Sequence, residues 1–353
     1  KMRMTYEDVN KVLKEKQDLE EYKPFKQDLL LMNELSNILR EKMNKRGYLN
    51  FGNNDLKIVV NENGKAIGIK EQEHDIAEKL IENFMILANE TVSKDISWKG
   101  LPCIYRIHDL PPIPAITRAL ETIKNFGYNV KIPNNFSSQS IQNILNKISK
   151  FEDNNILSTI LLTGMSRACY NTNNIGHFGL ALDYYSHFTS PIRRYPDLIL
   201  HRLIREYNYN YSEDIINKNK EYLPVATEHL SIREQEAQNC ERDVDKMKKA
   251  EYMMDHIGEV YEGIISGVQE FGFFVELDNT VEGLVRVEDI KGDYFIYNPD
   301  LMALLGKRSK RKYAFGDKVV VKVVSADKDK STIDFEIYEE GKNKKNKKND
   351  TKK

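Results

Sequence analysis

The hydrophobic pattern of the chain changes its period once, near residue 257. Before that point apolar residues recur mainly every three to four positions, which is typical of amphipathic helices. After it they alternate with polar residues in short runs, which is typical of strands that bury one face. The change predicts two domains, a helix-rich one over residues 1–256 and a β-rich one over residues 257–339.

The helix-rich part is predicted to open with a helix capped by Thr5. A second helix follows Pro24 and ends at Gly47, with its buried side formed by Phe25, Leu31, Leu35, Ile38 and Leu39. Further helices are expected over residues 73–95, 115–126, 138–149, 153–168 and 224–256. Short strands are expected over residues 48–51, 56–60, 66–69 and 176–182.

The β-rich part contains five short alternating runs, at residues 260–265, 272–277, 281–287, 318–324 and 332–337. Five antiparallel strands over this length predict a small barrel of the OB type, so the expected class is α+β. Phe271 and Phe274 share a face only if Gly272 bends the strand. Such rings either stack on bases or belong to the core, and the pattern alone leaves both open.

Composition limits the setting in which the chain works. No apolar run reaches the roughly 18 residues that cross a bilayer, and the first residues have no apolar stretch typical of a secretory signal. The three cysteines, Cys103, Cys169 and Cys240, are far apart, which argues against a disulfide framework or a structural zinc site. These features favour a reducing cytoplasm and no membrane association.

Charge is balanced overall, with 53 Lys and Arg against 54 Asp and Glu, but it is unevenly distributed. Residues 257–340 hold 11 basic and 17 acidic residues, whereas residues 341–353 hold 7 Lys and one Asp. This Lys-rich tail, residues 340–353, is expected to be disordered, and it either solubilises the chain or contacts RNA loosely. A basic run at residues 307–312 interrupts the acidic domain and indicates a local patch.

Candidate chemistry concentrates at residues 187–202, which read HFTSPIRRYPDLILHR. Ser190 and Pro191 are typical of a helix start, where free backbone N–H groups attract anions. Arg193 and Arg194 would add two permanent charges there, which suits a phosphodiester. Arg193, Asp197 and His201 would share one helix face. The alternatives are an ordinary Arg193–Asp197 ion pair and a structural His201.

These residues resemble a known family. The string HFTSPIRRYPDL, preceded by GHFGL at residues 176–180 and followed by ERDV at residues 241–244, resembles the exoribonuclease domain of the ribonuclease R and ribonuclease II (RNB) family. Three further segments resemble the S1 RNA-binding domain, a variant of the OB fold: GII at residues 263–265, FGFFV at 271–275 and EGLV at 282–285. The resemblance implies a partial RNB-type domain followed by an S1 barrel.

The family resemblance implies an enzyme that removes nucleotides processively from the 3′ end of single-stranded RNA, releases nucleoside 5′-monophosphates and uses Mg²⁺. Carried over by position, Arg193 would hold the scissile phosphate beside Arg194, and Glu241 would orient the terminal nucleotide. The implied RNA contacts are Tyr6, Phe51, Glu82, Phe271, Phe274 and Arg286. Tyr6 and Phe51 are alternatively core aromatics, and Glu82 is alternatively a solvated carboxylate.

One departure from the family pattern limits the expected activity. The family's metal-binding aspartates precede the region of Tyr6, and no metal ligand is assigned within this chain. We therefore expect the C-terminal part of a longer enzyme, monomeric and inactive on its own. The alternative is a noncatalytic RNA-binding or scaffold protein that keeps the RNA channel and the barrel.

Overall fold

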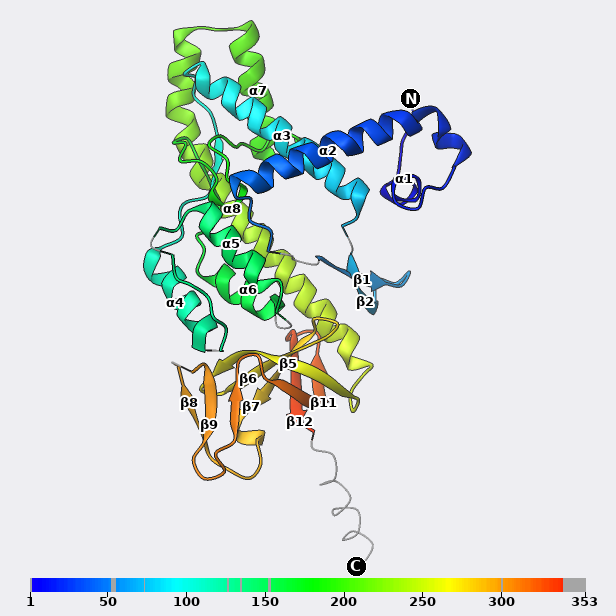
Figure 1. Ribbon diagram of the computed structural model, residues 1–353, viewed down its shortest axis with the longest axis vertical. Helices are drawn as coiled ribbons and strands as arrows, with labels where there is room; N and C mark the ends of the chain where they lie inside the picture. Colours follow the sequence, from blue (N-terminus) through cyan, green and yellow to red (C-terminus); the bar gives the residue numbers. More distant parts are fainter. Residues whose placement is uncertain are drawn as a thin grey trace, which may run out of the picture. The chain divides into compact units, whose positions relative to one another are not determined.

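A computed structural model of the chain describes residues 2–51, 55–72, 74–125, 127–133, 135–151, 154–299 and 301–338 (Figure 1). It divides into two compact units, one of residues 1–53 and 73–237 and one of residues 54–72 and 238–353. The division falls inside one long helix, α8 (Glu213–Met254). The domain limits at residues 256 and 339 remain a sequence-based prediction, and the predicted tail lies outside the described residues.

The first unit is rich in helices, as the sequence predicted. Its described helices are α1 (Tyr6–Leu13), α2 (Lys26–Arg46), α3 (Ile76–Trp98), α4 (Ile113–Asn125), α5 (Ser138–Ile148), α6 (Asn154–Thr163), α7 (Tyr195–Tyr209) and the first part of α8. Two predicted caps are confirmed. The Thr5 side chain accepts a hydrogen bond from Asp8 N, and Gly47 ends α2 in the left-handed region at a φ of 103°.

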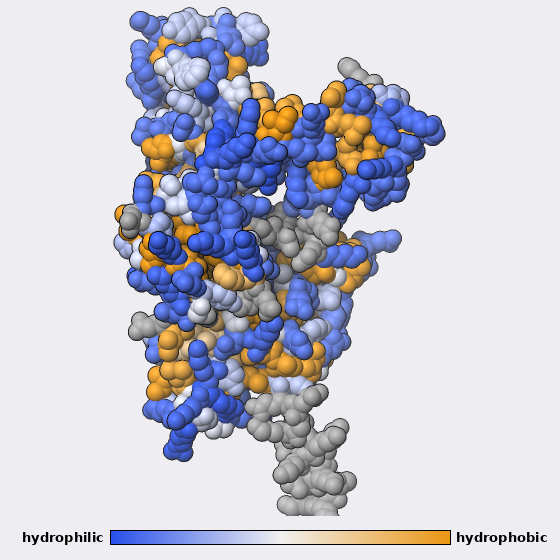
Figure 2. Space-filling model, in the orientation of Figure 1, coloured by the Kyte–Doolittle hydropathy of each residue, from blue (hydrophilic) through white to orange (hydrophobic). Residues whose placement is uncertain are grey.

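The predicted buried face of α2 is wrong. Leu31, Leu35 and Ile38 are exposed, and Figure 2 shows hydrophobic residues reaching the surface over this helix. The buried residues of the helix are instead Leu29, Ser36 and Met43. Leu29 and Met43 pack with apolar residues of α3, and Asn83 Nδ2 donates to Ser36 Oγ at 2.8 Å in a buried contact. Hydrophobicity alone therefore selected the wrong side of the helix.

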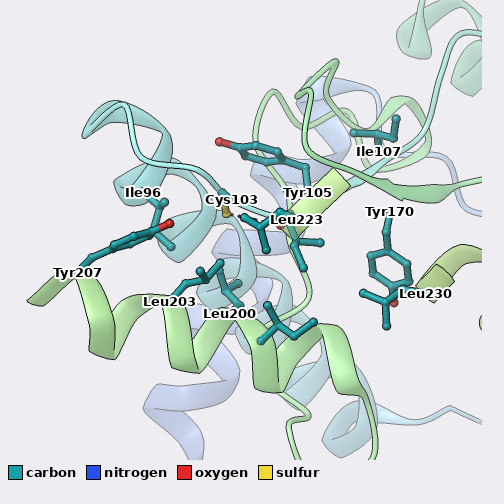
Figure 3. Packing of buried hydrophobic residues seen from close by; sticks show 12 residues of the cluster. Ile96, Cys103, Tyr105, Ile107, Tyr170, Leu200, Leu203, Tyr207, Leu223 and Leu230 are labelled. Carbon is teal, nitrogen blue, oxygen red and sulfur yellow. Dashed lines mark hydrogen bonds between the residues drawn. The ribbon is translucent and has the colours of Figure 1, made fainter. Parts of the chain in front are cut away.

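A hydrophobic core joins the end of α3 to β3 (Tyr105–Ile107), β4 (Cys169–Asn171), α7 and α8 (Figure 3). Its buried residues are Ile96, Cys103, Ile104, Tyr105, Ile107, Tyr170, Ile199, Leu200, Leu203, Tyr207, Leu223 and Leu230. β3 and β4 pair antiparallel next to this core. The segment that precedes α7 is therefore built on a rigid, well-packed base.

Two predicted strands of the first unit are absent. Residues 48–51 form no strand, and the GHFGL segment forms a short 3₁₀ helix, Phe178–Leu180. That segment is held by side-chain hydrogen bonds, since the Leu180 backbone N–H donates to His177 Nδ1 at 3.1 Å. Such bonds compete with a strand ladder, which explains the failure of the prediction.

The second unit contains a closed barrel with strand order β11-β12-β7-β6-β5. The strands are β5 (Val260–Gln269), β6 (Gly272–Leu277), β7 (Glu282–Arg286), β11 (Lys318–Asp327) and β12 (Thr332–Ile337). The five predicted strands and the barrel are confirmed. The expectation of antiparallel pairing throughout is wrong, because β12 pairs parallel with β7.

A β-hairpin, β1 (Asp55–Val60) with β2 (Ala66–Gln72), also belongs to the second unit. It is anchored to the end of α8 through Glu251, whose carboxylate accepts from Ala66 N at 3.1 Å and from Lys248 Nζ at 2.7 Å. The hydrogen bond from Lys248 is the largest of several contacts that lower the pKa of Glu251 to about 2. None of the described helices in either unit has the length and apolar character that a membrane crossing needs.

A three-stranded sheet that the sequence did not predict lies beside the barrel in the same unit (Figure 1). Its strands are β8 (Phe295–Asn298), β9 (Ala303–Gly306) and β10 (Lys312–Ala314). Tyr313 of β10 stacks on Phe273, a fully buried ring of β6, with the ring centroids 5.2 Å apart. The sheet is thus packed onto the barrel core rather than projecting as a loose loop.

Candidate functional site

The two arginines of the HFTSPIRRYPDL string lie in a tight turn, not in a helix. The Ser190 carbonyl accepts from Arg193 N at 3.3 Å and from Arg194 N at 2.9 Å. α7 begins only at Tyr195, after an extended Arg194, and Pro196 occupies the first turn. The predicted helix start at Ser190 and Pro191 is therefore wrong, because the second proline of the string starts the helix.

The backbone amides of this turn are used internally. Ser190 N donates to Asp197 Oδ1 at 2.7 Å, and the amides of Arg193 and Arg194 bond to the Ser190 carbonyl. They are therefore not the free helix-terminal donors that the sequence suggested. Any anion recognised here would be held by the guanidinium groups rather than by these amides.

Asp197 holds the turn in place through its buried carboxylate. Its side chain is fully buried, and Oδ1 also accepts from Arg194 Nη2 at 2.9 Å. The sequence had offered a pair between Arg193 and Asp197, and the structure shows that the partner is Arg194. Because a buried carboxylate is costly without partners, this pair determines how the turn is held.

Arg193 is left exposed by this arrangement. Within the described residues it takes part in no ion pair, and its side chain extends from the fixed turn. The two neighbouring arginines therefore differ. Arg194 holds the turn together, whereas Arg193 keeps its charge available for a ligand.

Three buried polar atoms around the turn have no hydrogen-bond partner in the described part of the chain. They are Thr189 Oγ1, Arg194 Nε and Asp197 Oδ2. Buried polar atoms are nearly always satisfied in folded proteins, so such a group marks a place where water or a ligand completes the hydrogen bonds. All three atoms come from one stretch of nine residues, 189–197, which singles out this turn.

The segment before the turn is held by buried polar residues of α3. Asn89 is almost fully buried; its Oδ1 accepts from Phe188 N at 2.9 Å and its Nδ2 donates to Tyr185 OH at 3.2 Å. Ser186 Oγ donates to the Ile104 carbonyl at 2.6 Å. These bonds position the chain on both sides of His187.

His187 joins this network to β4 through its 2.8 Å contact between Nδ1 and Tyr170 OH. Burial and, next, Arg194 lower the pKa of His187 to about 2, and burial lowers that of His177 to about 3. Both imidazoles are therefore neutral near pH 7. They position their neighbours and cannot supply a proton there.

Arg106 extends the network from β3 to α8. Its guanidinium is paired with the Glu234 carboxylate and lies over the Tyr170 ring, 4.8 Å from the centroid. His201, in contrast, packs flat on Phe188 with ring centroids 4.2 Å apart, and its Nε2 is 3.0 Å from the Phe188 carbonyl. These contacts support the structural interpretation of His201.

The other predicted residues of the first unit lie on separate elements. Tyr6 opens α1 and is half exposed, and Phe51 follows α2 and is partly buried. Glu82, on α3, lies 4.0 Å from Arg40, which covers the Tyr48 ring. Within the part of the chain that the structure describes, none of these residues forms a hydrogen bond or ion pair with the turn, so their RNA roles stay predictions.

In the second unit, Phe271 and Phe274 lie together at the start of β6. Phe271 is in the turn before the strand, which begins at Gly272, and its ring meets that of Phe274 edge to face with the centroids 6.1 Å apart. Phe271 is 54% exposed. A side chain at Gly272 would place its Cβ 2.2 Å from the Val285 carbonyl oxygen, so only glycine fits there. The two rings thus share a face because Phe271 lies outside the strand, and base stacking stays a prediction.

Glu241 and Arg286 also belong to the second unit. Glu241 is exposed on α8, and Arg286, at the end of β7, lies 3.3 Å from Asp334 of β12. An exposed pair of this kind contributes little to stability, so Arg286 can exchange its partner for a phosphate at small cost. Neither role is decided by these positions.

A divalent metal ion needs several His, Cys, Asp or Glu side chains close together. No group of three or more His, Cys, Asp or Glu side chains among them could hold a metal ion. The residues described here thus do not make the carboxylate cluster that the resemblance implies, and the chemistry of such an ion is not assigned to them.

Sequence reasoning missed the residues that support the turn through buried hydrogen bonds and ion pairs. Asp197 was considered only as a surface partner of Arg193, and Asn89, Tyr170, Arg106 and Glu234 were not considered as one network. Apart from Asp197, which contacts Ser190 and Arg194, the members of this network have partners 17 to 128 residues away in the chain. Helical spacing cannot reveal these long-range contacts, although the polar Asn89 on the buried face of α3 was a usable signal.

Comparison with known proteins places the chain in a family of nucleases. Residues 1–210 match the RNB domain family, and residues 255–338 match the S1 RNA binding domain family. Because the first match covers more than half of the chain, the chain belongs to the RNB family.

Individual relatives show how similar the chain is to known members of the family and of the fold. Ribonuclease R 1 of Lactococcus lactis is 44% identical over 95% of this chain and 41% of its own length. Ribonuclease R of Mycoplasma genitalium, solved in complex with ribose-methylated single-stranded RNA, has a TM-score of 0.89 and 28% identity over 95% of this chain and 53% of that one. A yeast pseudonuclease shares the fold alone, with a TM-score of 0.59, 18% identity and coverage of 91% and 38%. The chain thus spans about half the length of the curated relatives it matches.

Proposed function

We propose that the chain is the RNA-holding portion of a 3′-to-5′ exoribonuclease of the ribonuclease R kind, acting on single-stranded RNA. The observation that carries the proposal is the Ser190–Asp197 turn. Arg193 stands exposed there without a carboxylate partner among the described residues, on a support fixed by the buried Asp197. An unpaired guanidinium carried on a fixed turn is suited to a phosphate that gains charge during cleavage.

The roles of the other residues follow from this proposal. Arg193 binds the scissile phosphate, Arg194 positions it by holding Asp197, and Glu241 orients the terminal nucleotide. Tyr6, Phe51 and Glu82 contact the last nucleotides, while Phe271, Phe274 and Arg286 capture RNA on the barrel. A cavity of about 650 Å³ between α2 and α3 is lined by four cations, Lys42, Lys45, Arg46 and Lys94, and by two carboxylates, Glu90 and Asp95. The excess of positive charge favours a polyanion.

The proposed enzyme uses Mg²⁺ held by aspartates that the described residues do not supply. The ion would activate water and stabilise the leaving oxygen. The chain's own residues bind the strand and place the phosphate. We therefore propose that the chain alone binds RNA and does not hydrolyse it.

Two measurements test the proposal. The purified chain should bind labelled single-stranded RNA and release no nucleoside monophosphate from it in Mg²⁺. Translation of the DNA upstream of Lys1 should reveal an in-frame segment rich in aspartate. Absence of RNA binding contradicts the proposal, release of monophosphates contradicts inactivity, and a start codon near residue 1 favours the noncatalytic scaffold.

A further inference from the structure

The basic run at residues 307–312 lies on a structured surface that the proposed function does not use. It forms the turn between β9 and β10 in the added three-stranded sheet. Residues 257–340 contain 11 Lys and Arg, and five of them lie within these six positions. No acidic residue occurs between 301 and 316, so this end of the sheet carries dense positive charge in an otherwise acidic domain.

The turn is held in one shape by its backbone. The Asp293 carboxylate accepts from Arg308 N at 2.9 Å and from Ser309 N and Ser309 Oγ at 2.6 Å each. These bonds, beginning with the Ser309 side chain, hold the pKa of Asp293 well below its usual range. Arg311 Nη2 donates to the Lys291 carbonyl at 2.6 Å, which ties the far end of the turn to the same loop.

The remaining cations of the turn point to solvent. Lys307, Arg308 and Lys310 are exposed and form no ion pair with any described residue. Elsewhere in residues 257–338 several cations do have carboxylate partners, namely Arg286, Lys322, Lys328 and Lys330. Because Asp293 is occupied by the backbone of the turn, it does not neutralise these side chains individually.

An exposed aromatic ring completes the surface. Tyr294 is 67% exposed, and the Lys307 ammonium lies 4.8 Å from its ring centroid. Lys307 N also donates to the Tyr294 carbonyl at 2.9 Å, so ring and turn are fixed together. A ring with one face on a cation and the rest in solvent can stack on a base while the neighbouring cations meet phosphates.

We propose that Tyr294 and the 307–312 turn form a second binding site for single-stranded RNA, separate from the Phe271–Phe274 pair. The inference rests on the proposed function, since it adds a contact for the same class of ligand. Lys307, Arg308 and Lys310 bind consecutive phosphates, and Tyr294 stacks on a base. The site is sequence-independent, because phosphates and ring faces are common to all nucleotides.

The test compares how RNA binding by the unmodified chain and by a variant depends on salt concentration. A fluorescein-labelled oligouridylate is titrated with the full chain in EDTA at several KCl concentrations. Replacing Lys307, Arg308 and Lys310 together by Gln should weaken binding about tenfold. It should also reduce the slope of log K against log salt by roughly 2, since each phosphate contact on a single strand contributes about 0.7.

The matched control removes the same charge elsewhere. Lys124, Lys218 and Lys220 are exposed on the first unit and have no assigned role, so their joint replacement by Gln should leave the slope unchanged. Equal effects of the two triple variants, or no effect of the first, overturn the site. If the unmodified chain does not bind the oligouridylate, the proposed function fails instead.

A single variant tests the ring. Tyr294→Ala should weaken binding several-fold without changing the salt slope, whereas Tyr294→Phe should bind as the unmodified chain does. Circular dichroism of each variant confirms folding, which surface substitutions should preserve. An unchanged affinity for Tyr294→Ala overturns the stacking role.

Discussion

The turn before α7 and the surface of the barrel hold their cations in opposite ways. At the turn, Arg194 is paired with a fully buried carboxylate, and several surrounding polar groups are bound to distant segments. On the barrel, Arg286 meets Asp334 in an exposed contact, and Phe271 is half exposed. The turn is therefore held rigidly by its partners, whereas the exposed groups on the barrel can exchange theirs.

Under the proposed function, this difference matches two tasks in RNA degradation. A phosphate under attack must be held within a fraction of an ångström, which requires supporting residues that are themselves locked. Capture of a moving strand requires aromatic and basic groups that accept any sequence. We therefore expect substitutions beneath the turn to affect stability strongly, and substitutions on the barrel surface to affect binding.

The largest effect is expected from Asp197→Ala. Loss of the carboxylate leaves Arg194 partly buried without its partner and removes the acceptor of Ser190 N. Breaking a buried ion pair in this way should lower the free energy of unfolding by about 3–5 kcal/mol. Urea denaturation of the purified chain measures the change.

A matched control is Asp95→Ala, which breaks an exposed pair with Lys99 that measures 2.7 Å. Exposed pairs contribute about 0–1 kcal/mol, so this variant should stay close to the unmodified chain. Similar losses for the two variants would mean that Asp197 is no more important than a surface carboxylate, and the contrast between the regions would disappear.

A smaller effect is expected on the barrel. Phe271→Ala combined with Phe274→Ala should weaken capture of single-stranded RNA by about 1–3 kcal/mol for each stacked base. In the full-length enzyme, cleavage of short, already threaded RNA should be nearly unchanged. Titration with long and short labelled RNA measures both quantities.

Phe273→Ala provides the structural comparison, because that ring is fully buried and stacks on Tyr313. It should cost about 3–5 kcal/mol of unfolding free energy. The surface double variant should cost much less. If the full-length enzyme carrying that double variant degraded short oligonucleotides as poorly as long ones, the capture role would be excluded.

A further effect concerns pH. Burial lowers the pKa of His187 to about 2 and that of His177 to about 3, against an ordinary value of 6.5. The unfolded chain therefore binds these protons first as the pH falls. The contribution of the two neutral histidines to stability is complete above about pH 6.5. As the pH falls from there toward their pKa values in the folded chain, the free energy of unfolding decreases by at most about 1.4 kcal/mol per pH unit for each histidine.

Urea denaturation at pH 7, 6 and 5 should thus show falling stability, and His187→Gln should flatten the curve. A glutamine is polar and has no charge to gain in this range, so the variant separates titration from loss of the contact. An identical pH slope in the variant would show that His187 does not titrate as its burial implies.

Sequence reasoning succeeded where periodicity and local turn chemistry decide the structure. Thr5, Gly47 and the five barrel strands were predicted because capping, left-handed glycine and alternation are local. The family was predicted from one dense string of residues at 187–198, and comparison with known proteins confirmed it.

Sequence reasoning failed where contacts between distant segments determine the structure. Leu31, Leu35 and Ile38 looked like a buried face, yet the residues of α2 that are buried are Leu29, Ser36 and Met43. The helix start at Ser190 was wrong because Asp197 captures that residue's amide. The three-stranded sheet was missed because its short strands adjoin Gly- and Lys-rich turns that weaken the alternation.

The most direct test of the account is Arg193→Ala in the full-length enzyme, with single-turnover cleavage and RNA affinity measured side by side. Removing one fixed donor to a developing charge should lower the cleavage rate about 10²–10³-fold while affinity changes only a few-fold. Equal loss in rate and affinity would reduce Arg193 to a simple binding residue, and an unchanged rate would contradict the claim that this exposed guanidinium meets the scissile phosphate.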